Sequence, residues 1–92
     1  MRYTLSQFNS FKKDIKRCKK RGYNFELLKK VLDKLAREGE LPAKYKSHKL
    51  SGNYQGRWEC HIKPDWLLIW KQDDDNKEII LERTGTHSDL FR

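Results

Sequence analysis

Three histidines and two acidic residues in this sequence have the types and spacing that acid–base chemistry needs. The histidines, His48, His61 and His87, all lie after residue 47. An imidazole exchanges protons near neutral pH because its ordinary pKa is about 6.5. Glu59 and His61 are two residues apart in an alternating segment, so in a strand they point to one face about 7 Å apart, and Asp65 follows shortly after. Single histidines are also tolerated at exposed positions, so an acid–base site requires that the three converge.

A set of three histidines and a carboxylate could also bind zinc or iron. The sequence contains no HxH or HExxH pair. Metal ligands would have to come from two loops and a strand, which does not match the usual ligand spacing. We therefore expect neither a metal nor another cofactor.

Positive charge is concentrated in the first half of the chain. The formal net charge is +8; residues 1–50 hold 15 Lys and Arg against 5 Asp and Glu, and residues 51–92 hold 6 against 8. In the run KKDIKRCKKRG, Asp14 is the only acid, and like charges three or four residues apart destabilise a helix by roughly 0.2–0.5 kcal/mol per pair. A polyanion such as RNA, or an acidic protein, would relieve this repulsion. We expect Lys16, Lys19 and Lys20 to bind RNA; a solvated helix face is the alternative.

Apolar residues at three- and four-residue spacing predict two helices. The first spans roughly residues 7–20, with Ser6 as its N-cap and Gly22 just beyond its end. The second begins after Asn24, a favourable N-cap residue, and ends before Gly39. The short connection between them predicts a helical hairpin.

The remaining segments predict a small antiparallel sheet. Alternation at Met1, Tyr3 and Leu5 indicates a short first strand. A loop of about fifteen residues follows the helices and is long enough to suggest function. Three further strands, which form a meander, are expected at residues 57–63, 66–70 and 78–83. About four strands with two helices on one face make an α+β fold.

The strand patterns also predict which side chains are buried. Trp58, Cys60 and Ile62 should face the core, and the residues that alternate with them should face outward. The continuous apolar run Trp66–Trp70 should be covered on both faces. Cys18 and Cys60 match neither a CxxC motif nor a disulfide framework, so we expect free thiols.

Length and hydropathy predict a single domain over residues 1–92. No apolar run approaches the ~20 residues that cross a bilayer. The first residues, MRYTLSQFNSFKK, lack the apolar core of a signal peptide. We expect a soluble, cytoplasmic protein without a membrane partner.

The second half of the chain resembles a known family in detail. The segments YKSHKLSGNYQGRWECHIKPDWLLIW and ERTGTHSDLF are similar to the YafQ-like branch of the RelE/ParE superfamily, toxins of bacterial type II toxin–antitoxin pairs. The helical hairpin matches this family in pattern. The resemblance implies a RelE-like fold and a ribosome-dependent endoribonuclease, or mRNA interferase, that cuts messenger RNA in the ribosomal A site. It also implies a DinJ- or RelB-like antitoxin; the toxin would be monomeric when free and hetero-oligomeric with the antitoxin.

The resemblance further implies roles for individual residues. Five positions match catalytic or acidic positions of the family: His48, Glu59, His61, Asp65 and His87. Glu59 stands where the best-known member has Asp, so its longer side chain shifts the carboxylate. Three more residues are expected to contact RNA: Arg57 on the outer strand face, Arg83 as a phosphate clamp and Phe91 as a stacking ring.

These residue types suit metal-free RNA cleavage, which needs a base for the 2′-hydroxyl, an acid for the departing 5′-oxygen and positive charge near the phosphate. We expect His87 to act nearest the scissile phosphate, with Asp65 and His61 as proton-transfer partners and His48 as a phosphate or hydroxyl contact.

Two alternative functions remain open. One is a non-catalytic basic module that binds nucleic acid or the ribosome, and the other is a homologue that mainly binds its antitoxin in operon repression.

Overall fold

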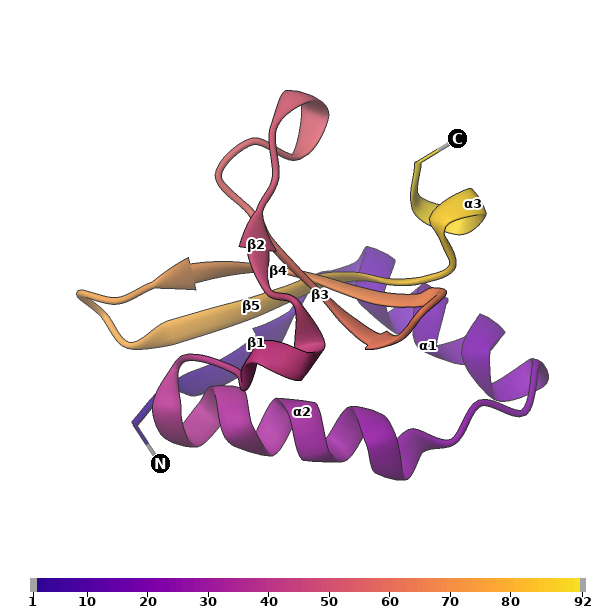
Figure 1. The fold of residues 1–92 in the computed structure, drawn as a ribbon, viewed down its shortest axis with the longest axis horizontal. Coiled ribbons are helices and arrows are strands. Elements are labelled where there is room, and N and C mark those ends of the chain that lie inside the picture. The colour runs from indigo at the N-terminus through magenta and orange to yellow at the C-terminus, as the bar shows by residue number, and fades with distance from the viewer. Residues whose placement is uncertain (1, 92) are drawn as a thin grey trace.

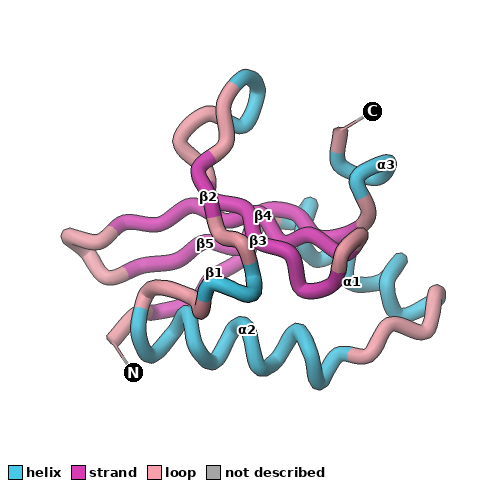
Figure 2. The backbone as a smooth tube through the Cα atoms, in the orientation of Figure 1, coloured by secondary structure: helices cyan, strands magenta, loops and turns pink. Residues whose placement is uncertain are grey.

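The computed structural model describes residues 2–91 and contains a five-stranded sheet with two helices on one face (Figure 1). The elements are β1 Thr4–Gln7, α1 Asn9–Lys20, α2 Phe25–Glu38, β2 His48–Lys49, β3 Trp58–Lys63, β4 Trp66–Asp73, β5 Glu78–Gly85 and α3 His87–Leu90. Two 3₁₀ helices flank β2, at Ala43–Tyr45 and Gly52–Tyr54, and loop segments connect them (Figure 2). The predicted α+β class is confirmed. Among residues 2–91, no helix has the length and apolar character to cross a membrane.

The first helix begins later than predicted because the first strand extends further. Ser6 pairs with Ile80 in the sheet, and the Phe8 N–H extends this ladder to the Leu81 carbonyl at 2.9 Å. Ser6 therefore cannot cap α1, which starts after Phe8 without a side-chain cap. The predicted N-cap at Ser6 was wrong.

The second helix has both predicted end signals. The Asn24 side chain accepts a hydrogen bond from the Glu26 N–H at 3.0 Å. Gly39 ends the helix with φ 72°, a left-handed conformation that glycine adopts at little cost. The Tyr3 ring lies where a Cβ at Gly39 would stand, so the end of α2 packs directly on the start of the chain.

The sheet contains five strands in the order β1-β5-β4-β3-β2, one more than predicted. β3, β4 and β5 form the expected antiparallel meander. β1 pairs with β5 in parallel, with Thr4 opposite Glu78, and it lies later than the predicted strand, of which Met1 falls outside the described residues. The additional strand, β2, pairs with β3 at His48 opposite Glu59. Two residues are too few to show a strand period, so the sequence predicted only a loop there.

The central strand β4 lies between two apolar clusters. On the side of α1 and α2, Leu68, Trp70 and Cys60 belong to the main core. On the other side lies a smaller cluster of Leu67, Ile69 and Leu90, with Leu50 and Tyr54 beside it. Trp66–Trp70 is thus buried on both faces, as predicted, and both cysteines are buried and free.

A short helix, α3, follows β5 where the sequence predicted only a tail. Thr86 and Asp89 form a capping box in which each side chain accepts a bond from the other's N–H, at 3.1 and 2.9 Å. Arg21, just after α1, donates two bonds to the Asp89 carboxylate at 2.6 and 3.1 Å. The start of α3 is therefore attached to the end of α1.

Candidate active site

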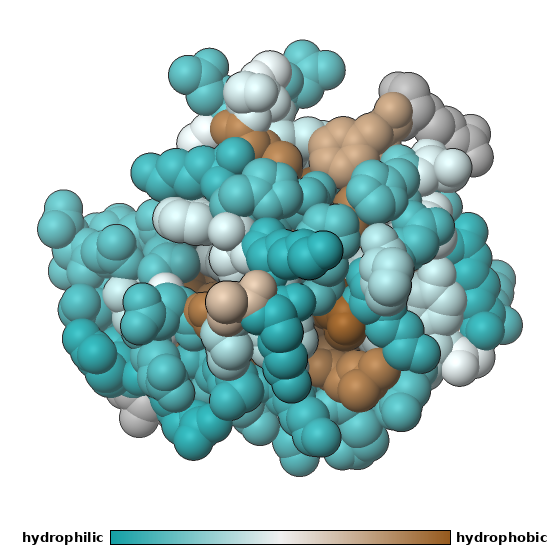
Figure 3. Space-filling model, viewed as in Figure 1, coloured by the Kyte–Doolittle hydropathy of each residue, from teal (hydrophilic) through white to brown (hydrophobic). Residues whose placement is uncertain are grey.

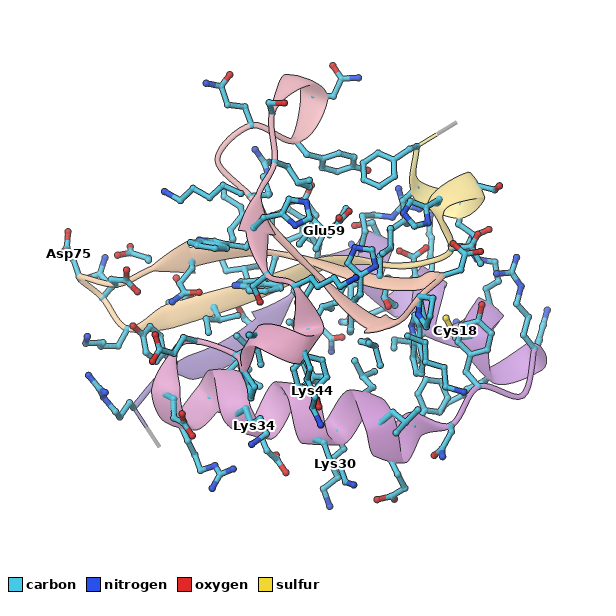
Figure 4. All side chains as sticks on the ribbon, in the orientation of Figure 1. Cys18, Lys30, Lys34, Lys44, Glu59 and Asp75 are labelled. Atoms are coloured by element: carbon cyan, nitrogen blue, oxygen red, sulfur yellow. The ribbon has the colours of Figure 1, made fainter. Side chains whose placement is uncertain are left out.

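The three histidines converge on the sheet face opposite to α1 and α2. The ring centroids of His48 and His61 are 6.4 Å apart, and those of His61 and His87 are 5.9 Å apart. These residues belong to β2, β3 and α3, so strand pairing and the turn into α3 bring them together. Figure 4 shows Glu59 on the side of the sheet away from α2. The structure thus assembles the predicted histidine cluster.

Asp65, in the turn between β3 and β4, orients the His87 ring. Its Oδ1 accepts a bond from the His87 backbone N–H at 2.9 Å and lies 2.7 Å from Nδ1. An ionised carboxylate only accepts hydrogen bonds, so Nδ1 carries the hydrogen and Nε2 is left to exchange a proton. The bonds from the His87 backbone and side chain hold the pKa of Asp65 below its usual value, so this carboxylate is ionised at neutral pH.

Glu59 is buried, although alternation predicted an outward-facing residue. Only 6% of its side chain is exposed, and its Oε1 lies 3.2 Å from His48 Nε2 and 3.9 Å from His61 Nε2. His48 Nδ1 lies 3.0 Å from the Lys46 carbonyl and must donate to that oxygen. Glu59 therefore contacts His48 and lies close to His61, so it can orient both rings.

Phe91 extends the row of rings beyond His87. Its centroid lies 6.4 Å from that of His87 and 5.6 Å from that of Tyr54, which it meets edge-on. Phe91 is 44% exposed, whereas the Tyr54 hydroxyl lies 3.5 Å from the Leu90 carbonyl. An exposed aromatic ring beside the imidazoles is suited to stack on an RNA base.

Arg83 on β5 is held by hydrogen bonds to Asp14 on α1. Its Nε and Nη2 donate to the Asp14 carboxylate at 2.7 and 3.3 Å, and its Nη1 donates to the Tyr54 hydroxyl at 3.3 Å. Asp14 is 2% exposed and also accepts the Thr84 N–H at 3.0 Å. These bonds connect α1 through β5 to the ring that supports Phe91. A direct contact between Arg83 and phosphate stays a prediction, because most of its donors already have partners.

The other predicted RNA contacts are not part of the histidine cluster. Arg57 Nε donates to Glu82 Oε1 at 2.9 Å, so this guanidinium is paired within the sheet. Lys16, Lys19 and Lys20 are exposed on α1, which covers the opposite face (Figure 1). These lysines are therefore not part of the histidine cluster, although α1 itself contacts α3 through Arg21 and Asp89.

Three residues that organise this site were not predicted: Asp14, Tyr54 and Asp89. Asp14 had a signal, because it is the only acid in a basic run and thus a natural ion-pair partner. Tyr54 is an aromatic residue between glycines in the long loop. Asp89 completes a T-x-x-D pattern with Thr86, which is typical of a capping box. Each of these sequence patterns could be recognised, but none predicted the distant residue with which the side chain interacts.

The described residues do not fit a metal centre. Within residues 2–91, no group of three His, Cys, Asp or Glu side chains is placed to hold a metal ion. The approaching imidazole and carboxylate atoms instead contact one another, as in His48 with Glu59 and His87 with Asp65.

Comparisons with known proteins agree over nearly the whole chain. The family described as "Bacterial toxin of type II toxin-antitoxin system, YafQ" matches residues 3–92. The mRNA interferase toxin YafQ of Escherichia coli strain K12 is 42% identical over 82 residues, covering 88% of this chain and 87% of that protein.

Two solved structures show the same fold. YafQ in the E. coli DinJ–YafQ toxin–antitoxin complex is 36% identical with a TM-score of 0.89, over 100% of both chains. A metal-bound toxin from Helicobacter pylori is 40% identical with a TM-score of 0.87, over 97% of this chain and 99% of that one. With the family match over residues 3–92, these similarities show that the chain belongs to the YafQ family of type II toxin–antitoxin toxins.

Proposed function

We propose that this protein is an mRNA interferase that cleaves messenger RNA on the ribosome by acid–base catalysis without a catalytic metal. The observation that carries the proposal is the His87 imidazole, which Asp65 orients through Nδ1 at 2.7 Å and which lies 5.9 Å from the His61 ring. The curated relative is named an mRNA interferase, and this side-chain arrangement has the chemistry that such cleavage requires.

The reaction is the attack of a ribose 2′-oxygen on the adjacent phosphorus, with departure of the 5′-oxygen. One group removes the 2′-hydroxyl proton, and another protonates the 5′-oxygen as its bond to phosphorus breaks. Imidazoles at the His61–His87 separation can approach one phosphate from two sides. The ionised Asp65 fixes the His87 tautomer so that Nε2 faces the substrate, while His48 contacts the phosphate or a hydroxyl. Phe91 stacks on a neighbouring base.

Glu59 is buried next to His48 and His61 and acts through these two histidines. Because it is buried between His48 and His61, it is a positioning residue that does not reach the RNA. Its Oε1 lies 3.2 Å from His48 Nε2 and so orients that ring. We derive no step through a metal, because the described side chains do not form a set of metal ligands.

The proposed partners are the ribosome, its bound mRNA and an antitoxin similar to DinJ, all met in the cytoplasm. The E. coli relative has been crystallised with DinJ, which supports an antitoxin of that kind here. We propose a monomeric toxin when free and a hetero-oligomer with the antitoxin. The main rival is a non-catalytic basic module that binds RNA or the antitoxin and represses its own operon.

Expression without an antitoxin separates these functions. We expect growth arrest and new mRNA 5′ ends within codons at the ribosomal A site. Purified protein should cut a defined mRNA on programmed ribosomes, as measured by primer extension. A folded protein that binds ribosomes but creates no new 5′ ends would support the binding module and contradict the nuclease.

A further inference from the structure

A cationic cavity lies beside the histidine cluster and has no role in the chemistry described so far. Its volume is about 380 Å³, and its lining residues are Lys44, Lys46, His61, Ile62, Lys63 and Pro64. Three of these six side chains are lysines, and no acidic side chain is among the described residues that line it. The three lysines are exposed, so their ammonium groups are available to a ligand. Figure 3 shows that hydrophilic side chains cover most of the face seen in Figure 1.

The segments that supply the lysines are the ones that place the histidines. The Lys46 carbonyl accepts the Nδ1 hydrogen of His48, and Lys46 has φ 53°. Lys44 Nζ lies 5.2 Å from the centroid of the Tyr45 ring, and Tyr45 is part of the main core. Lys63 ends β3 at a register shift that follows His61. The backbone segments that carry these lysines are therefore held next to the imidazoles rather than on an independent surface.

His61 belongs both to the cavity wall and to the row of rings. A phosphate bound near His61 and His87 would place the next part of its strand at the mouth of the cavity. A second cavity, of about 400 Å³, shares Lys63 and Pro64 with the first, but its lining holds the Asp65 carboxylate and a single lysine instead of three. Charge therefore favours the lysine cavity as the path of the RNA backbone.

We propose that Lys44 and Lys63 form a subsite for the backbone phosphate next to the scissile phosphate of the mRNA. This inference rests on the proposed nuclease function and deepens it by defining where the strand leaves the cleavage centre. Each ammonium group that neutralises a phosphate releases counterions, so binding must depend on salt. An acidic antitoxin segment could bind the same lysines. RNA is favoured because His61 both lines this cavity and lies next to His87 in the proposed cleavage site.

The test compares two double variants that lose the same charge. Lys44→Gln/Lys63→Gln removes the proposed subsite, and Lys29→Gln/Lys30→Gln removes two exposed lysines from α2 that do not line the cavity. Lys46 is kept because it has a left-handed φ of 53°, and a substitution that shifted its backbone would move the carbonyl that contacts His48. The probe is a 2′-O-methyl hexaribonucleotide, which lacks the attacking hydroxyl, and its affinity is measured by fluorescence anisotropy across a salt series. Thermal melting confirms that both variants are folded.

We expect the Lys44→Gln/Lys63→Gln variant to bind the probe about tenfold more weakly, with a log–log salt slope reduced by at least about 0.7, the value for one phosphate contact on a single strand. The Lys29→Gln/Lys30→Gln control should match the parent. Equal losses in both variants would overturn the subsite, because they would indicate a general effect of charge. The subsite is also wrong if probe affinity is unchanged and only antitoxin affinity falls.

Ribosome-dependent cleavage is measured on the same preparations and tests the nuclease proposal separately. A parent protein that binds the probe through these lysines but cuts no mRNA would refute the nuclease and leave an RNA-binding site. A parent that cuts mRNA, with a double variant whose salt slope is unchanged, would refute the subsite alone.

Discussion

His87 makes both of the contacts on which the proposed chemistry depends: its ring lies next to the Asp65 carboxylate and close to the His61 ring. Its side chain is 55% exposed, so truncation should cost about 0.5 kcal/mol of stability or less. The backbone bond from residue 87 to Asp65 does not need the imidazole, so α3 should stay in place after substitution. This residue therefore allows chemistry to be separated from folding.

We predict that His87→Ala abolishes most cleavage while leaving a folded protein. If the imidazole transfers a proton, the rate on programmed ribosomes should fall by roughly 10²–10⁴-fold. Ribosome association, measured by co-sedimentation, should persist because the basic residues are intact. Cleavage near the parental rate would remove His87 from the reaction and move the main acid–base role to His61 and Asp65.

A second prediction at this scale concerns metal ions. Because His48 and His87 direct ring atoms at carboxylates instead of a common centre, chelation should not reduce cleavage once the ribosome's own magnesium requirement is met. The measurement is the cleavage rate after dialysis against a chelator that spares magnesium. Loss of activity that zinc or manganese restores, saturating near one ion per chain, would contradict this expectation.

The residue types of the site were readable from the sequence, but their surroundings were not. His48, His61 and His87 could be selected by chemistry and by resemblance, and the structure brings them together. The burial of Glu59 was missed because alternation assigns a strand face and cannot say what covers it; His48 on the unpredicted β2 is opposite Glu59. Tyr54 was missed because its partners are distant in sequence.

At the scale of elements, the position of α3 depends on α1. Arg21 donates to Asp89, and this contact holds the pKa of Asp89 well below its usual value. A carboxyl group with a depressed folded-state pKa stabilises the fold above its ordinary pKa of about 3.9, and that stabilisation is lost as the pH falls further. Arg21 is thus a positioning residue for the helix that carries His87.

We predict that Arg21→Gln lowers the cleavage rate about 10- to 100-fold with little change in KM, because small displacements of a catalytic group have effects of this order. Arg21→Lys, which keeps the charge, should recover part of the rate. Lys13→Gln, an equal charge change elsewhere on α1, is the control. If Lys13→Gln and Arg21→Gln behave alike, the loss reflects net charge and not the position of α3.

The same contact predicts how stability depends on pH. The difference in melting temperature between the parent and Arg21→Gln should be largest at neutral pH. It should decrease as the pH falls below about 3.9, because Asp89 in the unfolded chain then becomes protonated. A difference that grows on acidification would show that Asp89 does not stabilise the fold through Arg21.

Helices and strands long enough to show a repeating apolar pattern were predicted well. Very short elements and the pairing of strands far apart in the sequence were not. α1, α2 and the meander follow from helical and strand spacing within each segment. The four-residue α3 and two-residue β2 are too short to display a period. The parallel pairing of β1 with β5 joins opposite ends of the chain, and local patterns carry no information about such a partner.

For the whole molecule, only part of the basic first half is separated in space from the histidines, because Lys44 and Lys46 line a cavity beside His61. α1 and α2 cover one face of the sheet, and the histidines lie on the other (Figure 1). The lysines of α1 are not part of the histidine cluster, although the end of α1 contacts α3 through Arg21 and Asp89. A large polyanion such as the ribosome could contact both faces of the sheet.

We predict that Lys16→Gln/Lys19→Gln/Lys20→Gln weakens ribosome association and flattens its salt dependence, by about 0.7–0.9 in log–log slope for each phosphate that α1 no longer binds. The cleavage rate at saturating ribosome should be preserved. The measurement is co-sedimentation across a salt series without antitoxin, which could occupy the same surface. An unchanged slope would identify this helix face as merely solvated.

The neighbouring positions of β1 and β5 also determine when the proposed nuclease can first exist. Thr4 lies opposite Glu78, so this pairing closes a long loop of the chain and needs both ends to be present. His87 follows β5, so it cannot meet Asp65 until the last strand has been synthesised and has joined the sheet. A partly synthesised chain would hold the helices and their lysines but no complete proton-transfer pair. The proposed proton-transfer pair is therefore completed only after β5 and α3 have been made.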